Sequence, residues 1–190
     1  DSCTEPGGLA GIAALQRAQN NGATWTINID RGLAANAAAD STAQSLIDNL
    51  AGARELLLAG VGGTASPETH ETYALQLEGI ATAIDRLAAQ KDVSGAPLFR
   101  SGPANMVRYN DSVTLAPVPP RDALFAPGGT DLAQIVRDAT TALRSGGPAA
   151  ADRGVDTLDT ALADATNALA RIGQTGAELE DLREFTARKA

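Results

Sequence analysis

Two long stretches of the chain carry apolar residues at alternating steps of three and four. The first stretch covers residues 24–60 and includes Ala43, Leu46, Leu50, Ala53 and Leu57. The second holds the spacing for more than three heptads, through Val155, Leu158, Leu162, Ala165, Leu169, Ile172, Gly176 and Leu179. This spacing places residues on one face of an α-helix. Each face needs a partner, so we expect the two long helices to pack antiparallel and bury each other.

Capping residues and breaks set the expected helix boundaries. The predicted helices cover residues 6–59, 67–91, 131–144 and 149–189. Gly60 fits a helix C-cap, and Ser66 followed by proline fits an N-cap. An apolar face already begins at Leu9, Ile12 and Leu15. The short turn between the first two helices predicts an antiparallel helical hairpin.

Gly22, Gly32 and Gly52 lie inside the first predicted helix. The segment 20–22 is a possible kink, so the continuity of this helix stays open. Glycine inside a helix costs about 1 kcal/mol relative to alanine. At Gly22 we favour a tolerated weak point. At Gly32 and Gly52 a close approach by a neighbouring helix is an equal alternative.

Residues 93–128 lose the helical period. Prolines at 97, 103, 117, 119, 120 and 127 exclude a helix there. Segments 106–109 and 112–115, on either side of a polar pair, predict a β-hairpin, and 97–99 could add a strand. The region also contains Phe99, Tyr109 and Phe125. We therefore expect it to form a small core of its own against the bundle.

The composition favours one elongated, mainly α domain over residues 1–190. Aromatic residues make up only 3% of the 190 residues, and alanine supplies much of the 44% hydrophobic content. Such a core is thin and suits long helices. A helix unbroken over 9–59 would be about 75 Å long. The predicted fold is an elongated antiparallel helical bundle, a rod with a small β-hairpin region.

Charge and cysteine content narrow the functional classes. The net charge is −8 and no lysine or arginine cluster occurs, which argues against nucleic-acid binding. The longest apolar run, 56–59, falls far short of the roughly 20 residues that cross a bilayer, so we expect no membrane insertion. Cys3 is the only cysteine, so an intrachain disulfide is impossible. No signal peptide is visible.

The sequence offers no catalytic constellation. His70 is the only histidine, and we expect it to be a solvated surface residue. Glu68 and Glu71 lie nearby but are spread around the helix, a poor metal-ligand set. Residues 60–64 resemble a phosphate loop only superficially, because they lack the lysine and follow a helix. We therefore expect no cofactor, no metal and no enzymatic activity.

Five segments, in chain order, resemble the bacterial flagellins and their hook–filament junction relatives. They read TEPGGLA at 4–10, NIDR at 28–31, AREL at 53–56, PLFRSG at 97–102 and GAELEDL at 176–182. Their order and spacing extend over nearly the whole chain. Residues 122–125 followed by an extra helix at 131–143 favour the type 3 hook-associated branch of this family over flagellin itself.

The resemblance implies a structural component of the flagellum that adapts hook packing to filament packing. Such a protein would be exported by the flagellar type III apparatus without a cleaved signal peptide and would lie outside the cell. Its implied partners are other hook-associated proteins and flagellin, with self-association in a ring when full length. The resemblance also implies that the terminal polymerisation segments are missing from residues 1–190.

The same resemblance suggests four candidate assembly contacts: Asn28, Arg31, Arg54 and Glu55. A solvated helix surface is the alternative interpretation of each. For the whole chain, flagellin itself is one alternative, and a helical-bundle sensory domain with a ligand pocket between helices is another. An enzyme is a third and weaker possibility.

Overall fold

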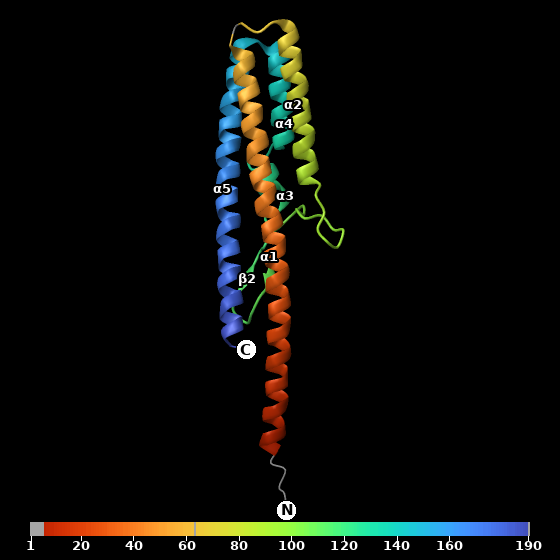
Figure 1. Ribbon diagram of the computed structural model, residues 1–190, viewed down its shortest axis with the longest axis vertical. Helices are drawn as coiled ribbons and strands as arrows, with labels where there is room; N and C mark the ends of the chain where they lie inside the picture. The colour runs from red at the N-terminus through yellow and green to blue at the C-terminus, as the bar shows by residue number, and fades with distance from the viewer. Residues whose placement is uncertain (1–5, 63, 190) are drawn as a thin grey trace, which may run out of the picture.

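The computed structural model describes residues 6–62 and 64–189, so Cys3 lies outside the described residues. The helices are α1 Pro6–Val61, α2 Pro67–Ala88, α3 Arg121–Phe125, α4 Leu132–Thr141, the π-helical η1 Ala142–Gly146 and α5 Gly147–Arg188. Two short strands, β1 Val107–Arg108 and β2 Thr114–Leu115, pair antiparallel. Figure 1 shows an elongated bundle in which the long helices run side by side. The predicted fold class is confirmed.

The first helix is continuous over its 56 residues, with no break at Gly22. A Cβ atom built at Gly22 would meet nothing within 4 Å, and one at Gly52 would make only ordinary contact with Ile80 at 3.7 Å. A Cβ at Gly32 would lie 2.4 Å from the Tyr109 hydroxyl. Close approach therefore explains Gly32, where the neighbour is the β-hairpin rather than a helix. Gly22 and Gly52 are tolerated positions.

The α1–α5 contact is the main axis of the core. Leu46, Leu50 and Leu57 of α1 are fully buried, as is Leu158 of α5. In Figure 1 the two helices lie next to each other and run in opposite directions. The apolar spacing of both stretches therefore predicts correctly which helices pair.

The buried face of α5 differs from the predicted heptad at two places. Ala161 and Ala168 are buried, whereas Leu162 and Leu169 are only partly buried and pack at the edge of the core. Alanine has a small side chain, so it lets two helices approach closely, and the larger leucines then cover the flank. Side-chain size, in addition to spacing, decides which residues face α1.

The junction between α4 and α5 is tighter than the predicted break at 145–148. The π-helical η1 joins the two helices, and the chain reverses at Gly147, whose φ is +71°. Only glycine adopts such a φ at little cost. The second helix, α2, ends at Ala88 rather than at the predicted residue 91. Beyond it, the Leu98 amide donates a hydrogen bond to the Gln90 carbonyl.

The 93–128 region does not have a core of its own, so that expectation is wrong. Phe99 and Phe125 meet edge to face with ring centroids 5.1 Å apart, inside the main core of the bundle. Tyr109 instead joins Ile29 and Leu179 in a second cluster between α1 and α5. The region is too small to bury three aromatic rings alone, and it lies against long apolar helix faces that can. The possible strand at 97–99 is reduced to one bridge between Lys91 and Pro97.

Candidate assembly surface

The N-terminal part of α1 extends beyond the end of α5 (Figure 1). Ile29 packs against Leu179, so nine residues further along α5 lead to Arg188, and nine residues back along α1 lead to Asn20. Residues 7–21 are all exposed. About four helical turns of α1 therefore stand without a neighbouring helix in the described part of the chain.

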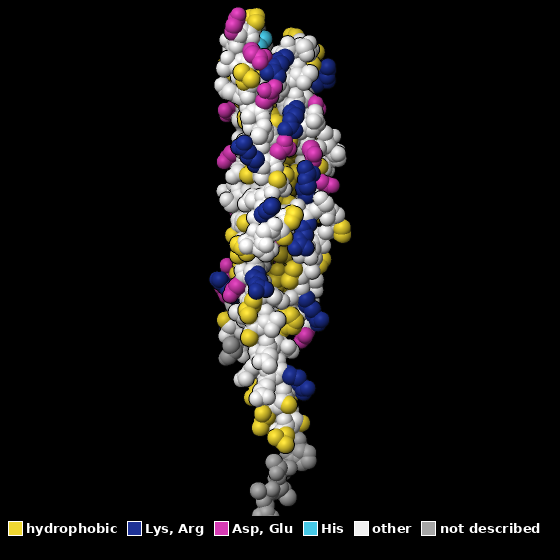
Figure 2. All heavy atoms as spheres, turned by 90° about the vertical axis from the view of Figure 1, so that its right-hand side faces the viewer, with side chains coloured by type: hydrophobic (Ala, Val, Ile, Leu, Met, Phe, Trp, Pro, Cys, Tyr) yellow, Lys and Arg dark blue, Asp and Glu magenta, His cyan; other side chains and the backbone are white. Residues whose placement is uncertain are grey.

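This free segment exposes apolar side chains, and Figure 2 shows hydrophobic side chains gathered at this end of the molecule. Leu9, Ile12 and Leu15 are 61%, 56% and 60% exposed. Steps of four, three, four and three lead back from the buried Ile29 through the half-buried Trp25 and Gly22 to the exposed Ala18 and Leu15. Leu15 therefore lies on the side of α1 that is buried further along the helix, whereas Leu9 and Ile12 lie outside this register. Clustered exposed apolar side chains mark an interaction site.

The four sequence-predicted contact residues do not form one site. Arg54 donates to Asp159 of α5 in an ion pair, and this hydrogen bond raises the pKa of Arg54. Its guanidinium thus joins α1 to α5. Arg31 and Glu55 are exposed and Asn28 is half-buried. Asn28 and Arg31 lie about 35 Å along α1 from Arg54 and Glu55.

His70, which we expected from the sequence to be solvated, caps α1 at the opposite end of the rod. His70 is half-buried, and its Nε2 lies 2.9 Å from the carbonyl oxygen of Gly60. Carbonyls in the last turn of a helix lack intrahelical partners, so this contact caps α1. The histidine comes close enough because the turn after Gly60 is short. Leu143 also packs against Gly60, where a Cβ would lie 2.2 Å from its Cδ1.

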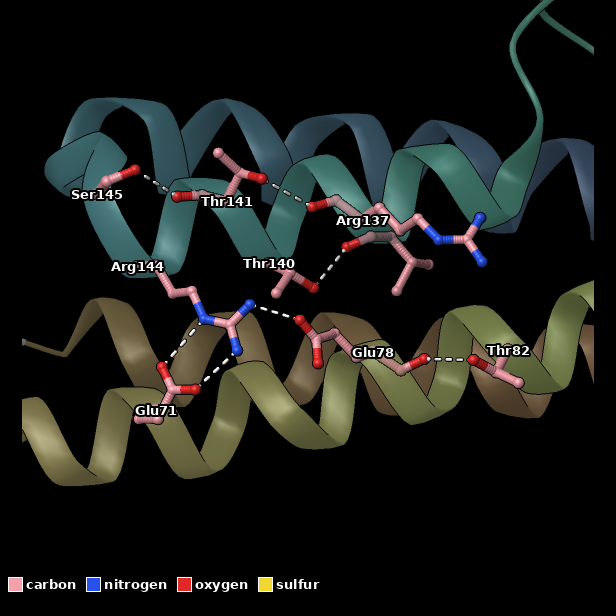
Figure 3. Close-up of polar contacts among 9 residues, drawn as sticks. Glu71, Glu78, Thr82, Arg137, Thr140, Thr141, Arg144 and Ser145 are labelled. Carbon is pink, nitrogen blue, oxygen red and sulfur yellow. Dashed lines mark hydrogen bonds and ion pairs between the residues drawn. The ribbon is translucent and has the colours of Figure 1, made fainter.

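An ion-pair cluster that the sequence did not reveal joins η1 to α2. Figure 3 shows Arg144 between Glu71 and Glu78. The Arg144 Nε and Nη2 atoms donate to both Glu71 carboxylate oxygens, at 3.0 and 2.7 Å, and Nη1 donates to Glu78. The hydrogen bond from Arg144 lowers the pKa of Glu71, and the two carboxylates raise the pKa of Arg144. Arg137 of α4 makes a similar pair with Asp85 of α2.

Two hollows of the described surface are small. One, of about 140 Å³, lies between α5 and residues 116–123, and another, of about 150 Å³, lies beside His70. Pockets for small-molecule ligands usually hold about 300–1,000 Å³. Within residues 6–62 and 64–189, no group of acidic, histidine or cysteine side chains is placed to hold a metal ion. Among those same residues, none of the helices is both long and apolar enough to cross a membrane.

Comparison with known proteins gives a match in structure. No protein-family model matches the sequence, and no curated protein is significantly similar to it. A protein of Vibrio parahaemolyticus described as a flagellar hook-associated protein superposes with a TM-score of 0.85 at 16% identity, over 98% of this chain and 94% of that one. The chain has the fold of a flagellar hook-associated protein.

A second solved structure agrees. FlgL of Bacillus cereus superposes with a TM-score of 0.80 at 15% identity, covering 95% of this chain and 97% of that chain. Since both superpositions cover nearly all of each chain, the shared fold includes the long helices and the region between them. The resemblance of the five sequence segments is thereby confirmed at the level of the fold.

Proposed function

We propose that the chain is a structural component of the bacterial flagellum and serves as an adapter at the hook–filament junction. The observation that carries this proposal is the agreement of fold over 98% of the chain with a protein described as flagellar hook-associated. The likeness to FlgL over 95% of the chain supports it independently. On this proposal the activity lies in surfaces and stiffness, and the protein is not an enzyme.

The build of the bundle suits a mechanical role. Two antiparallel helices of 56 and 42 residues form its length. Ion pairs join α1 to α5 and η1 to α2, which opposes sliding of the helices along one another. The alanine-rich core keeps the rod thin, so many copies can stand side by side. We propose that these copies form a ring in contact with other hook-associated proteins and flagellin, outside the cell after type III export.

The free segment of α1 supplies a means of attachment at one end of the rod. Covering Leu9, Ile12 and Leu15 with a partner helix would contribute up to about 2 kcal/mol for each side chain. Because these residues lie on the part of α1 that extends beyond α5, a partner there would lengthen the bundle along its axis. Axial contacts at this end and lateral contacts along the rod are the two kinds that a ring of adapters needs.

Deletion of the gene in the bacterium that encodes this chain tests the proposal. We expect cells with complete hooks, no attached filaments, and unassembled flagellin in the medium, with attachment restored by the wild-type gene. Filaments of normal length on the deletion strain would contradict the proposal. Loss of flagellin from the medium would favour the alternative that this chain is flagellin.

A further inference from the structure

The apolar interior of the rod is divided into two clusters. On α1 the buried residues of the main cluster begin at Ala39, and on α5 they end at Ile172. The other, which we call the end cluster, consists of the fully buried Ile29, Tyr109 and Leu179, with Leu33, Val107, Leu115 and Leu182 packed against them. Among the described residues, none belongs to both clusters. The rod therefore contains two separate units of packing.

A polar layer separates the two clusters. Asn36 lies between them on α1, is 6% exposed, and donates hydrogen bonds of 3.0 Å to the carbonyls of Pro117 and Ile172. On α5 this layer contains Gly176, where a Cβ would lie 2.5 Å from the Asn36 Oδ1, and Gly173 lies three residues before it. Glycine is a poor helix former. In this described stretch of α5, residues 173–178, none is fully buried, so the apolar packing of α5 is interrupted here.

The end cluster holds two segments that are distant in sequence. The strands β1 and β2 have two residues each, and an isolated hairpin of this size is marginally stable at best. Tyr109 anchors the hairpin to Ile29 of α1, and Leu179 anchors the last turns of α5 to the same cluster. Figure 1 shows the hairpin beside α1 and α5, at a level that α2 and α4 do not reach. Because both segments depend on the same three buried side chains, detachment of one removes packing from the other.

The end cluster also contains a destabilising group. The Tyr109 side chain is fully buried, and its hydroxyl has no hydrogen-bond partner among the described residues. This hydroxyl faces the backbone of α1 at Gly32, where a Cβ would lie 2.4 Å from its oxygen. A buried hydroxyl without a partner is unfavourable, because it has given up its hydrogen bonds to water. Opening of the end cluster restores those bonds.

We propose that residues 107–115 and 177–189 form one cooperative unit, which detaches from α1 while the main cluster stays folded. We call it the end unit. Local units of this kind open at a lower free energy than the whole protein. Opening uncovers Ile29 and Leu33, on the side of α1 that also carries Leu15, so a partner helix can take the place of the last turns of α5. The inference concerns the single chain and does not depend on the proposed flagellar role.

The only tryptophan of the chain is placed to report this opening. Trp25 is half-buried and lies one turn before Ile29 on α1. Its fluorescence follows the end unit, whereas far-ultraviolet circular dichroism follows the helices of the whole rod. In a urea titration of the purified chain, we expect the Trp25 transition at lower urea than the main dichroism transition. Coincident transitions would overturn the proposal, because they indicate a single cooperative unit.

Tyr109→Phe tests whether the hairpin and the end of α5 open together. Removing the hydroxyl that lacks a partner should favour the closed end unit about tenfold. The Trp25 transition should therefore move to higher urea, while the main dichroism transition stays in place. Tyr73→Phe is the matched control, because Tyr73 is the only other tyrosine and packs against the main cluster. If Tyr109→Phe moves the Trp25 transition no more than this control does, the hairpin is not part of the end unit and the proposal is wrong.

Leu179→Ala tests the same unit from α5 and in the opposite direction. Loss of this fully buried leucine should favour opening by roughly a hundredfold, so amides of residues 107–115 should exchange with solvent faster. Phe185→Ala, at an exposed position near the same end of α5, should leave that exchange unchanged. Exchange in residues 155–172 should be the same in both variants. Equal acceleration in 107–115 and 155–172, or none in 107–115, would contradict a separate end unit.

Discussion

Asn36 of α1 lies so close to Gly176 of α5 that a Cβ atom at position 176 would be 2.5 Å from the Asn36 Oδ1. The amide group of Asn36 is buried and donates to the carbonyls of Pro117 and Ile172. One polar side chain therefore joins α1, α5 and the segment before α3. A buried polar residue of this kind fixes the register between helices, because a shift would leave it without partners.

Gly176→Ala should destabilise the protein by about 1–3 kcal/mol, because the added methyl group must displace Asn36. Gly173→Ala is the matched control, since a Cβ at Gly173 meets nothing within 4 Å. We expect that control to be more stable by about 0.5–1 kcal/mol, from helix propensity alone. Chemical denaturation measures both. Equal effects of the two substitutions would contradict the close approach.

Asn36→Ala should lower the free energy of unfolding by about 1–3 kcal/mol, because the buried carbonyl of Ile172 and the half-buried carbonyl of Pro117 lose this donor. In the background of Asn36→Ala, Gly176→Ala should cost less than in the wild type, because the clash is gone. Denaturant titration of the four chains in this cycle gives the coupling directly. Additive effects would show that the two residues do not act through each other.

Leu50→Ala should cost about 2–5 kcal/mol, as expected for a fully buried leucine. Leu162→Ala should cost about 1–2 kcal/mol, since this side chain lies at the edge of the core. Urea titration of both variants shows which substitution lowers the free energy of unfolding more, and so tests which residues of α5 face the core. A larger loss at Leu162 would favour the strict heptad.

The pairing of Glu71 with Arg144 should make stability depend on pH. The pKa of Glu71 is lowered from 4.5 in the folded protein by its hydrogen bond with Arg144. A lowered pKa gives stability that is present above pH 4.5 and is lost as the pH falls towards the lowered value. Comparing Glu71→Gln with wild type from pH 7 to pH 3 should show a difference that shrinks on acidification. In an Arg144→Gln background this pH dependence should disappear.

Leu15→Glu should leave the unfolding free energy within about 0.5 kcal/mol of wild type, because the side chain is exposed. In complemented deletion cells, however, the exported variant should fail to attach filaments, since a charge would occupy the apolar face of α1. Leu75→Glu on α2 is the control and should restore attachment. Equal rescue by both variants would show that the free α1 face is not used in assembly.

The spacing of apolar residues was enough to predict which helices pair, because a face such as Leu46, Leu50 and Leu57 can be satisfied only by another long face. It could not show that Ala161 rather than Leu162 would face α1, because that choice depends on how closely two backbones approach. The sequence also could not predict where Phe99 and Phe125 pack. Their environment depends on how residues 93–128 lie against helices that are distant in sequence.

The candidate surface was predictable only in outline. The apolar residues beginning at Leu9 were visible in the sequence, but their exposure depends on which other segments lie level with them along the rod. Arg54 belongs to a segment that carries the family resemblance, yet it is paired with Asp159 within the same chain.

The position of the protein on intact flagella is the sharpest test of its proposed role as an adapter. An epitope-tagged copy, expressed at its native level, can be located by immunogold electron microscopy. We expect gold confined to a narrow band where the hook meets the filament. Gold along the whole filament would contradict this role and favour flagellin, and gold confined to the cell body would contradict any role in the external flagellum.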